Sequence, residues 1–270
     1  MKLFACMCNQ PQRLKMALAP VRSALLAQPP IQRWGLGYIQ GGDVLLVRTP
    51  KSSATAVDLA GPLSEIATDC AIAQAVDDDG FAGTDNTPPF RFRRWLFAQT
   101  FNRGNPNGAL EALAPRLLEH IPEYLRRNIK GRTPSELVFH LFLSMLHDEG
   151  NIDDPNLPTA ATRRALAATL KLVAAEIEKL DPESKSALGN VALTNGRSMV
   201  VARRDEPLRL RRLWVNNDRG EAERGHDSFR GVLLVSGGDG DPREGFEDVP
   251  ANHAVLISRD LQVTLADLAP

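Results

Sequence analysis

Cysteine is scarce in this chain of 270 residues, which has only Cys6, Cys8 and Cys70. Three thiols cannot form an even disulfide framework, and no Cys-x-x-Cys pair with a second half is present to bind zinc. The low cysteine content therefore excludes a disulfide-held scaffold. We expect reduced thiols, no metal and no cofactor.

An excess of charge is also lacking, because 32 basic residues balance 33 acidic ones. Without a net field, the chain has no general attraction for nucleic acid or for anionic lipid. The apolar run over 137–146 is broken by His140 and Ser144, and it is shorter than the roughly 20 residues that a membrane helix needs. The first residues lack the sustained apolar segment of a signal peptide. These absences predict a cytoplasmic protein that binds neither nucleic acid nor membrane.

Hydrophobic periodicity predicts the elements of the first hundred residues. A short apolar run before Pro11 predicts a strand over 3–8, and apolar residues at helical spacing predict a helix over 12–28. The pair Gly41-Gly42 between two apolar segments predicts a hairpin. Further strands are expected over 69–76 and 95–100.

The rest of the chain changes from a helical to a strand pattern. Two helices are expected within 107–149, the second capped by Thr133 with Pro134 in its first turn, and a third over 159–180. A hairpin around Asn195-Gly196 follows. The last strands are expected over 209–215, 231–237 and 253–265. Strands, helices and strands again, without regular alternation, predict an α+β fold, which we interpret as one domain over 1–270.

Six segments in this order resemble the class II glutamine amidotransferases, and in particular their small stand-alone members. LFACMCNQP resembles the first strand of that family, and WGLGYIQGGDVLLVRTP its Trp-Gly hairpin. NTPPF followed by WLFAQTFN is similar to its Asn-Thr-His-Pro-Phe and Phe-Ala-His-Asn-Gly segments. The other three segments are GRTPSELVFHLFLSML, NVALTNGRSMVVA and GFEDVPANHAVLISRDLQV. The resemblance implies the N-terminal-nucleophile fold, a four-layer αββα sandwich of two antiparallel sheets between helical layers.

The chemistry implied by the resemblance is hydrolysis of the side-chain amide of glutamine. It requires an N-terminal cysteine as nucleophile, with its own α-amino group as base. An Asn side chain and a Gly N–H form the oxyanion hole. An arginine and an aspartate hold the carboxylate and the ammonium group of the substrate.

This chain departs from the family at almost every one of those positions. Aligned on the first strand, Met1 takes the place of the nucleophile, and Ala73 that of the arginine. Pro88 replaces a histidine and Pro134 replaces the aspartate. The His-Asn-Gly turn becomes Gln99, Thr100 and Phe101, and Trp34 of the Trp-Gly hairpin completes the altered cleft.

The loss of the arginine and the loss of the aspartate compensate each other, because losing only one would leave an unpaired charge in the pocket. We therefore hypothesise a pseudoenzyme, without catalysis, that binds a protein partner or a small ligand in the altered cleft. The partner is not identified by the sequence, and a homo-oligomer stays open. One alternative is a divergent amidotransferase or amidohydrolase with another nucleophile. The other is that the first residues of this sequence differ from the natural N-terminus, so that the nucleophilic cysteine is missing from this sequence alone.

Two arginine-rich segments, RFRRWLF and RLRRLW, predict strands with arginines on one face and Phe92, Trp95, Leu210 and Trp214 buried on the other. An ordinary solvated face is the simpler interpretation. The alternative is an interaction surface, since arginine and tryptophan are enriched in binding hot spots. The arginines concerned are Arg91, Arg93, Arg94, Arg209, Arg211 and Arg212.

The cysteines, His140 and the acidic loops could serve a site, but each has a simpler structural interpretation. The three cysteines are interpreted as small buried side chains, and His140 as a core or interface residue. The acidic loops over 77–80 and 237–248 are interpreted as solvated, because their spacing does not fit a calcium loop.

Overall fold

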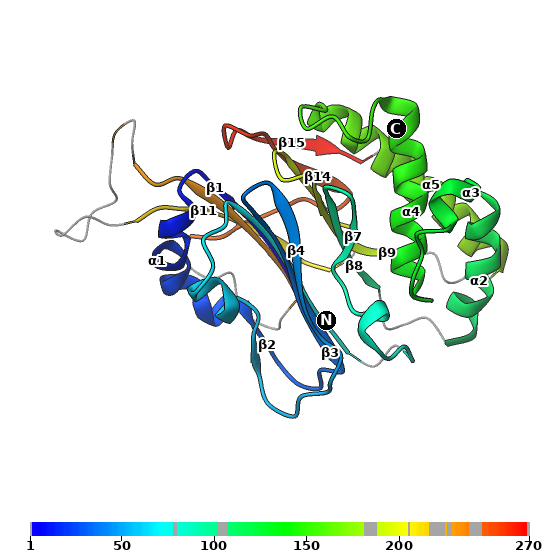
Figure 1. Ribbon diagram of the computed structural model, residues 1–270, viewed down its shortest axis with the longest axis horizontal. Helices are drawn as coiled ribbons and strands as arrows, with labels where there is room; N and C mark the ends of the chain where they lie inside the picture. Colours follow the sequence, from blue (N-terminus) through cyan, green and yellow to red (C-terminus); the bar gives the residue numbers. More distant parts are fainter. Residues whose placement is uncertain are drawn as a thin grey trace.

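Two antiparallel sheets lie face to face at the centre of the computed structural model (Figure 1). The structure describes residues 2–77, 80–101, 107–180, 188–204, 206–215, 225, 228–237 and 245–268. Met1, one of the positions singled out in the sequence, lies outside these residues. Strands and helices together form an α+β fold, as the sequence predicts.

The first sheet has the strand order β13-β11-β12-β1-β6-β3-β4. Its strands are β1 (Lys2–Cys8), β3 (Arg33–Gln40), β4 (Asp43–Thr49), β6 (Cys70–Val76), β11 (Leu208–Leu213), β12 (Gly231–Ser236) and β13 (Glu247–Asp248). The predicted hairpin is confirmed, with Gly41 and Gly42 at φ of 61° and 90° between β3 and β4. β1 lies inside the sheet between β6 and β12, and all of its residues are buried.

The second sheet has the order β15-β14-β10-β9-β8-β7. Its strands are β7 (Phe90–Phe92), β8 (Trp95–Phe101), β9 (Leu188–Thr194), β10 (Met199–Ala202), β14 (His253–Ile257) and β15 (Val263–Asp267). The hairpin predicted around Asn195-Gly196 joins β9 to β10. A separate pair, β2 (Leu26–Ala27) with β5 (Val57–Asp58), was not expected from the sequence.

Alternation along the strands divides the apolar side chains into three clusters. Leu3 and Ile72 of the first sheet and Leu96 and Val255 of the second share a cluster between the sheets. Phe4 belongs to a second cluster on the outer face of the first sheet. Residues of the second sheet and of the long helices form the third cluster.

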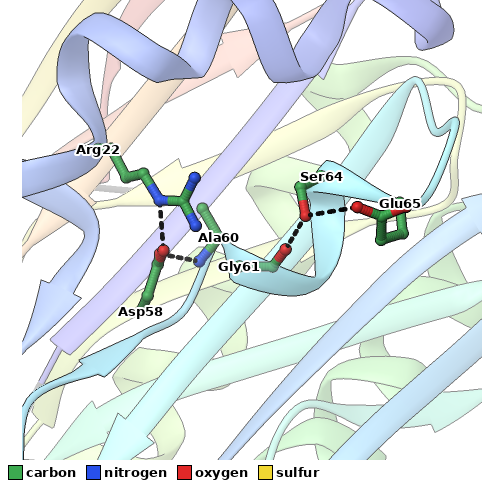
Figure 2. Close-up of polar contacts among 6 residues, drawn as sticks. All are labelled: Arg22, Asp58, Ala60, Gly61, Ser64 and Glu65. Carbon is green, nitrogen blue, oxygen red and sulfur yellow. Dashed lines mark hydrogen bonds and ion pairs between the residues drawn. The ribbon is translucent and has the colours of Figure 1, made fainter.

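The outer face of the first sheet is covered by short helical segments. They are η1 (Pro11–Arg13), α1 (Leu14–Leu18), η2 (Ala19–Leu25) and η3 (Gly61–Ser64). A single helix over 12–28 was predicted, and this was wrong, because Pro20 has no N–H for the helical ladder and the segment continues as 3-10 helix. Asp58, at the end of β5, joins two of these helical segments (Figure 2). Its Oδ2 lies 2.5 Å from Arg22 Nε of η2, and its Oδ1 accepts from the N–H of Ala60, directly before η3, at 3.1 Å.

The helices of the middle of the chain lie together beside the second sheet (Figure 1). They are α2 (Asn107–Glu119), α3 (Glu123–Arg126), α4 (Pro134–Glu149) and α5 (Thr159–Leu180). Phe97 of β8 stacks on Phe139 of α4 at 5.1 Å between ring centroids. Across the described residues, no helix is both long and apolar enough to span a membrane.

The start of α4 confirms the predicted cap. The Thr133 hydroxyl accepts a hydrogen bond from the N–H of Glu136 at 3.4 Å. The Glu136 carboxylate accepts from the N–H groups of Lys130 and Gly131, at 3.0 and 2.7 Å, rather than from that of Thr133. Glu136 therefore ties α4 to the segment before it, and the short η4 (Thr84–Asn86) packs against this turn, since Asn86 Oδ1 accepts from the N–H of Arg132 at 2.7 Å.

Candidate functional site

A small cavity of about 30 Å³ lies where β3, β6 and β8 meet the start of α4. Its lining comes from these four elements and from the segment that includes η4 and the beginning of β7. β1 begins close by, because Lys2 pairs with Ala75, the residue before Val76 in the cavity wall. The N-terminal end of the described chain therefore lies beside this cavity.

Four of the positions that the sequence singles out lie together in the cavity wall. These are Pro88, Gln99, Phe101 and Pro134. They come from the segment before β7, from β8 and from the start of α4, so residues 46 positions apart in the chain share one small site. A β-bulge interrupts the register of β8 between Gln99 and Phe101.

Three other singled-out positions lie away from the cavity wall. Ala73 and Trp34 contribute to the cluster on the outer face of the first sheet. The Thr100 hydroxyl accepts from the N–H of Asn190 at 2.9 Å. The strand neighbours of the first two, Gln74 and Arg33, line the cavity instead.

The two glutamines in the wall have buried polar atoms that no described protein atom satisfies. Gln74 and Gln99 are each 1% exposed, and Gln74 Nε2 donates to the backbone carbonyl of Gln99 at 2.7 Å. Gln74 Oε1 and both polar atoms of the Gln99 side chain have no hydrogen-bond partner among the described protein atoms. Buried polar groups are almost always paired, so these three atoms are exceptions among the described residues.

Arg33 brings a positive charge to the wall, and sequence reasoning missed it. The residue is 2% exposed, and its Nε and Nη1 donate to the carbonyls of Asn86 at 2.9 Å and Phe81 at 2.6 Å. A signal was available, because alternation in β3 places Arg33 and Trp34 on opposite faces. The resemblance drew attention to the tryptophan and not to its neighbour.

Glu136, immediately behind the wall, has a raised pKa because burial disfavours its charged form. The hydrogen bonds from Lys130 and Gly131 act in the opposite direction. Both carboxylate oxygens are committed to these N–H groups, so Glu136 positions the start of α4 rather than lining the cavity.

The thiols are buried, as expected, and none is in the cavity wall. Burial raises the pKa of Cys8 and of Cys70 to about 12 and that of Cys6 well above its ordinary value. The thiolate is the reactive form of cysteine, so all three are protonated and inert near neutral pH. His140 is also buried, and its Nδ1 lies 2.9 Å from the carbonyl of Glu136.

The acidic loops fall partly outside the described residues, which omit Asp78, Asp79 and 238–244. Asp77 is buried rather than solvated. In the described parts of the chain, no group of three His, Cys, Asp or Glu side chains is arranged to hold a metal ion.

The first arginine-rich segment is not one strand. The chain reverses direction between β7 and β8, which pair antiparallel. Arg93, with a φ of 51°, and Arg94 form the turn between them. Arg93 pairs with Asp153, Arg94 Nη1 donates to the carbonyl of Asp153 at 3.1 Å, and Arg91 Nη1 donates to that of Val44 at 2.7 Å.

The second segment is a strand, β11, but Trp214 lies beyond its end. The prediction that Trp214 is buried was wrong, since the residue is 43% exposed, whereas Phe92, Trp95 and Leu210 are buried as predicted. Arg211 lies over the rings of Trp214 and Phe246, at 5.6 and 5.4 Å from their centroids. Arg209 pairs with Asp248 at 3.3 Å, and Arg212 lines a neighbouring hollow beside Met16. Arg94 lines a different pocket from Arg211 and Arg212.

Comparison with solved structures identifies proteins of similar fold. No protein-family model matches the chain, and no curated protein matches it by sequence. A glutamine aminotransferase class-II domain protein from Silicibacter pomeroyi is similar over 100% of both chains, with a TM-score of 0.58 and 18% identity.

Two further structures show the same likeness. A predicted glutamine amidotransferase from Pseudomonas aeruginosa has a TM-score of 0.54 and 13% identity, over 97% of this chain and 98% of its own. The glutamine phosphoribosylpyrophosphate amidotransferase of Bacillus subtilis has a TM-score of 0.54 and 11% identity, over 100% of this chain and 49% of its own. At these identities the likeness establishes the fold alone.

Proposed function

We propose that this chain is a glutamine amidotransferase-like protein that does not hydrolyse glutamine and acts by binding a protein partner or a small ligand in its altered cleft. The observation that carries the proposal is the size of the cavity at this cleft, about 30 Å³. Small-molecule sites typically start at about 300 Å³, so this cavity is small for a site that encloses a free amino acid.

The chemistry of the described wall supports the same conclusion. It contains hydroxyl groups from Thr133 and Ser135 but no His, Cys, Lys, Asp or Glu side chain. A hydroxyl nucleophile needs an adjacent base, and a substrate ammonium group needs a carboxylate. Neither is found among the described residues of the wall.

The substitutions also compensate one another in packing. Phe101 and Pro134 supply apolar volume where the resembled family keeps a glycine and an aspartate. Pro134 suits the first turn of α4, because a proline there gives up no helical hydrogen bond. The packing of this cleft excludes free glutamine as a ligand. Arg33, Gln74 and Gln99 keep its wall polar, which suits a smaller or different ligand.

The alternative of a divergent amidohydrolase requires a reactive nucleophile near the cleft. The thiols do not favour it, since all three are buried away from the cavity wall and have raised pKa values. We also infer that residues 1–270 form one domain with the four-layer αββα arrangement, which the three apolar clusters and the similar structures support.

The first test combines calorimetric titration with glutamine and an ammonia-release assay, with an active class II amidotransferase as positive control. We expect neither binding nor ammonia. Steady ammonia release by the purified chain would overturn the proposal, and its loss in the triple variant Cys6→Ser, Cys8→Ser, Cys70→Ser would identify a thiol nucleophile.

The second test asks whether the cleft binds something else. A thermal-shift screen of small polar compounds is run on the wild type and on Gln99→Leu, which removes two unpaired polar atoms from the wall. A compound that stabilises only the wild type binds in the cleft. For the partner alternative, the purified partner should lose affinity for a variant with a bulkier cleft, Ser135→Leu, and keep it for the surface variant Arg127→Gln.

A further inference from the structure

A larger groove, of about 530 Å³, lies at the other end of the two sheets. β1 connects the two sites, because Lys2 pairs beside the small cavity and Cys8, at the end of the strand, lines the groove. Seven residues of strand span about 20 Å. The turns β3–β4, β7–β8, β9–β10 and β14–β15 all contribute to the groove.

The groove combines apolar and cationic walls. Met7, Cys8, Ile39 and Val44 line it and are almost fully buried. Arg94, Arg197 and Arg259 line it from three different turns. Asp69 is the single acidic side chain in the described lining, so positive charge dominates.

The guanidinium groups are largely uncommitted. Within the described structure, the side chains of Arg197 and Arg259 make no hydrogen bond or ion pair, although Arg259 interacts electrostatically with Asp69. Arg94 uses Nη1 for the carbonyl of Asp153, but its Nε is buried and has no partner among the described atoms.

Neighbouring acidic groups are engaged elsewhere. The Asp153 carboxylate pairs with Arg93, and Asp260 Oδ1 accepts from the hydroxyl of Ser258 at 2.5 Å. The three arginines of the groove therefore keep donor capacity for a ligand.

The turn that carries Arg197 is held in one conformation. Asn195 Oδ1 accepts from the N–H groups of Arg197 and Ser198, both at 2.9 Å. Thr194 Oγ1 accepts from the N–H of Gly196 at 3.0 Å. A fixed turn reduces the conformational entropy lost when a ligand binds.

We propose that this groove binds a small organic anion, with a phosphate or carboxylate group held by Arg94, Arg197 and Arg259 and an apolar body lying on Met7, Ile39 and Val44. Guanidinium groups bind both oxyanions through paired, charge-assisted hydrogen bonds. A volume near 530 Å³ is typical of small-molecule sites. The site is separate from the altered cleft, and the proposal does not depend on what the cleft does.

The test is calorimetric titration with phenyl phosphate and with benzoate, which distinguishes a phosphate from a carboxylate head group. Benzamide, which has no charge, and inorganic phosphate, which has no apolar body, are the comparisons. We expect at least one aromatic anion to bind more tightly than benzamide and than inorganic phosphate. Binding should weaken as ionic strength rises, because salt screens the arginines.

Variants locate the site. Arg197→Gln and Arg259→Gln should each weaken binding of the anion about tenfold or more, since a hydrogen bond to a charged group contributes that much. Asp69→Asn should strengthen it by removing a repelling charge. Arg127→Gln, at an exposed arginine directly after α3, and Gln99→Leu in the cleft should leave it unchanged.

Absence of binding by both aromatic anions, equal binding of benzamide, or full affinity in the two arginine variants would each overturn the proposal. Circular dichroism of every variant checks the fold, and both arginines lie in turns at the surface.

Discussion

At the scale of single residues, the small cavity is lined by two buried side-chain amides, those of Gln74 and Gln99. Gln99→Leu removes no hydrogen bond to a described protein atom, so we expect it to change the free energy of unfolding by less than about 1 kcal/mol. Asn190 is a matched control, because its side chain bonds Ser236 Oγ, the carbonyl of Glu206 and the N–H of Arg204. Asn190→Leu should cost about 2–4 kcal/mol.

Urea unfolding of both variants measures the difference. A loss in Gln99→Leu as large as that in Asn190→Leu would mean that Gln99 is paired with bound water or a ligand in the folded protein.

The buried thiols predict a dependence of stability on pH. Cys70 keeps its proton in the folded protein up to about pH 12, whereas in the unfolded chain it loses the proton near its ordinary pKa of 9.0. The stabilisation is therefore fully present below pH 9 and is lost between pH 9 and 12. The free energy of unfolding should fall less steeply over pH 8–10.5 in Cys70→Ala than in the wild type, as measured by urea unfolding. Equal slopes would contradict the assignment.

The motifs of the resemblance placed some of the singled-out residues in one cavity, and the match to a strand without a motif placed none there. Pro88, Gln99, Phe101 and Pro134, singled out from separate motifs, line one cavity, whereas Thr100 and Trp34, also singled out from motifs, do not. Ala73 was matched to a featureless alanine-rich strand, where a shift of one residue exchanges the two faces of the sheet. Gln74, the residue that lines the cavity, was therefore missed.

At the scale of elements, β3 and the segment that carries Pro88 approach too closely for a side chain. A Cβ built on Gly35 would lie 2.3 Å from the carbonyl oxygen of Pro88. Gly35→Ala should therefore destabilise the fold by about 1–3 kcal/mol, because two backbones must separate. Gly61 is the control, since its Cβ would meet only ordinary contacts with Asp58, at 3.6 Å or more.

Thermal unfolding of the two alanine variants tests this packing. The expected result is a lower melting temperature for Gly35→Ala and little change for Gly61→Ala. Equal effects would show that the contact between β3 and Pro88 is not constrained.

Elements with strong local signals were predicted with nearly correct bounds, and the errors have local causes. Strand alternation, paired turn glycines and the Thr133 cap each depend on neighbours in sequence, so they could be recognised. The segment over 12–28 carried a helical period but also Pro20, and the proline determined the outcome. Trp214 was assigned to a strand over 209–215, but β11 ends at Leu213, so Trp214 lies outside the strand and is not buried by it.

At the scale of the whole molecule, the cluster between the sheets makes the two sheets depend on each other. Neither sheet can keep its inner face buried if the other unfolds. We predict one cooperative transition reported equally by both sheets. In the variant Trp34→Phe, Trp214→Phe, fluorescence of Trp95 reports the second sheet, and labelling of Cys6 and Cys8 reports the first.

Coincident midpoints of the two signals in urea are the expected result. Two separated midpoints would show that the sheets unfold as independent units, and would contradict the prediction.

The order of the strands also sets a schedule for folding during synthesis. β1 is synthesised before every other strand of its sheet, but it lies inside that sheet, and its partner β12 follows only at Gly231–Ser236. At about 5–20 residues per second, β1 waits roughly 10–50 s for that partner. Throughout this interval an apolar strand has one edge without its native neighbour. The nascent chain should therefore depend on chaperones more than its balanced composition suggests, and the first sheet should close only after β12 and β13 have been synthesised.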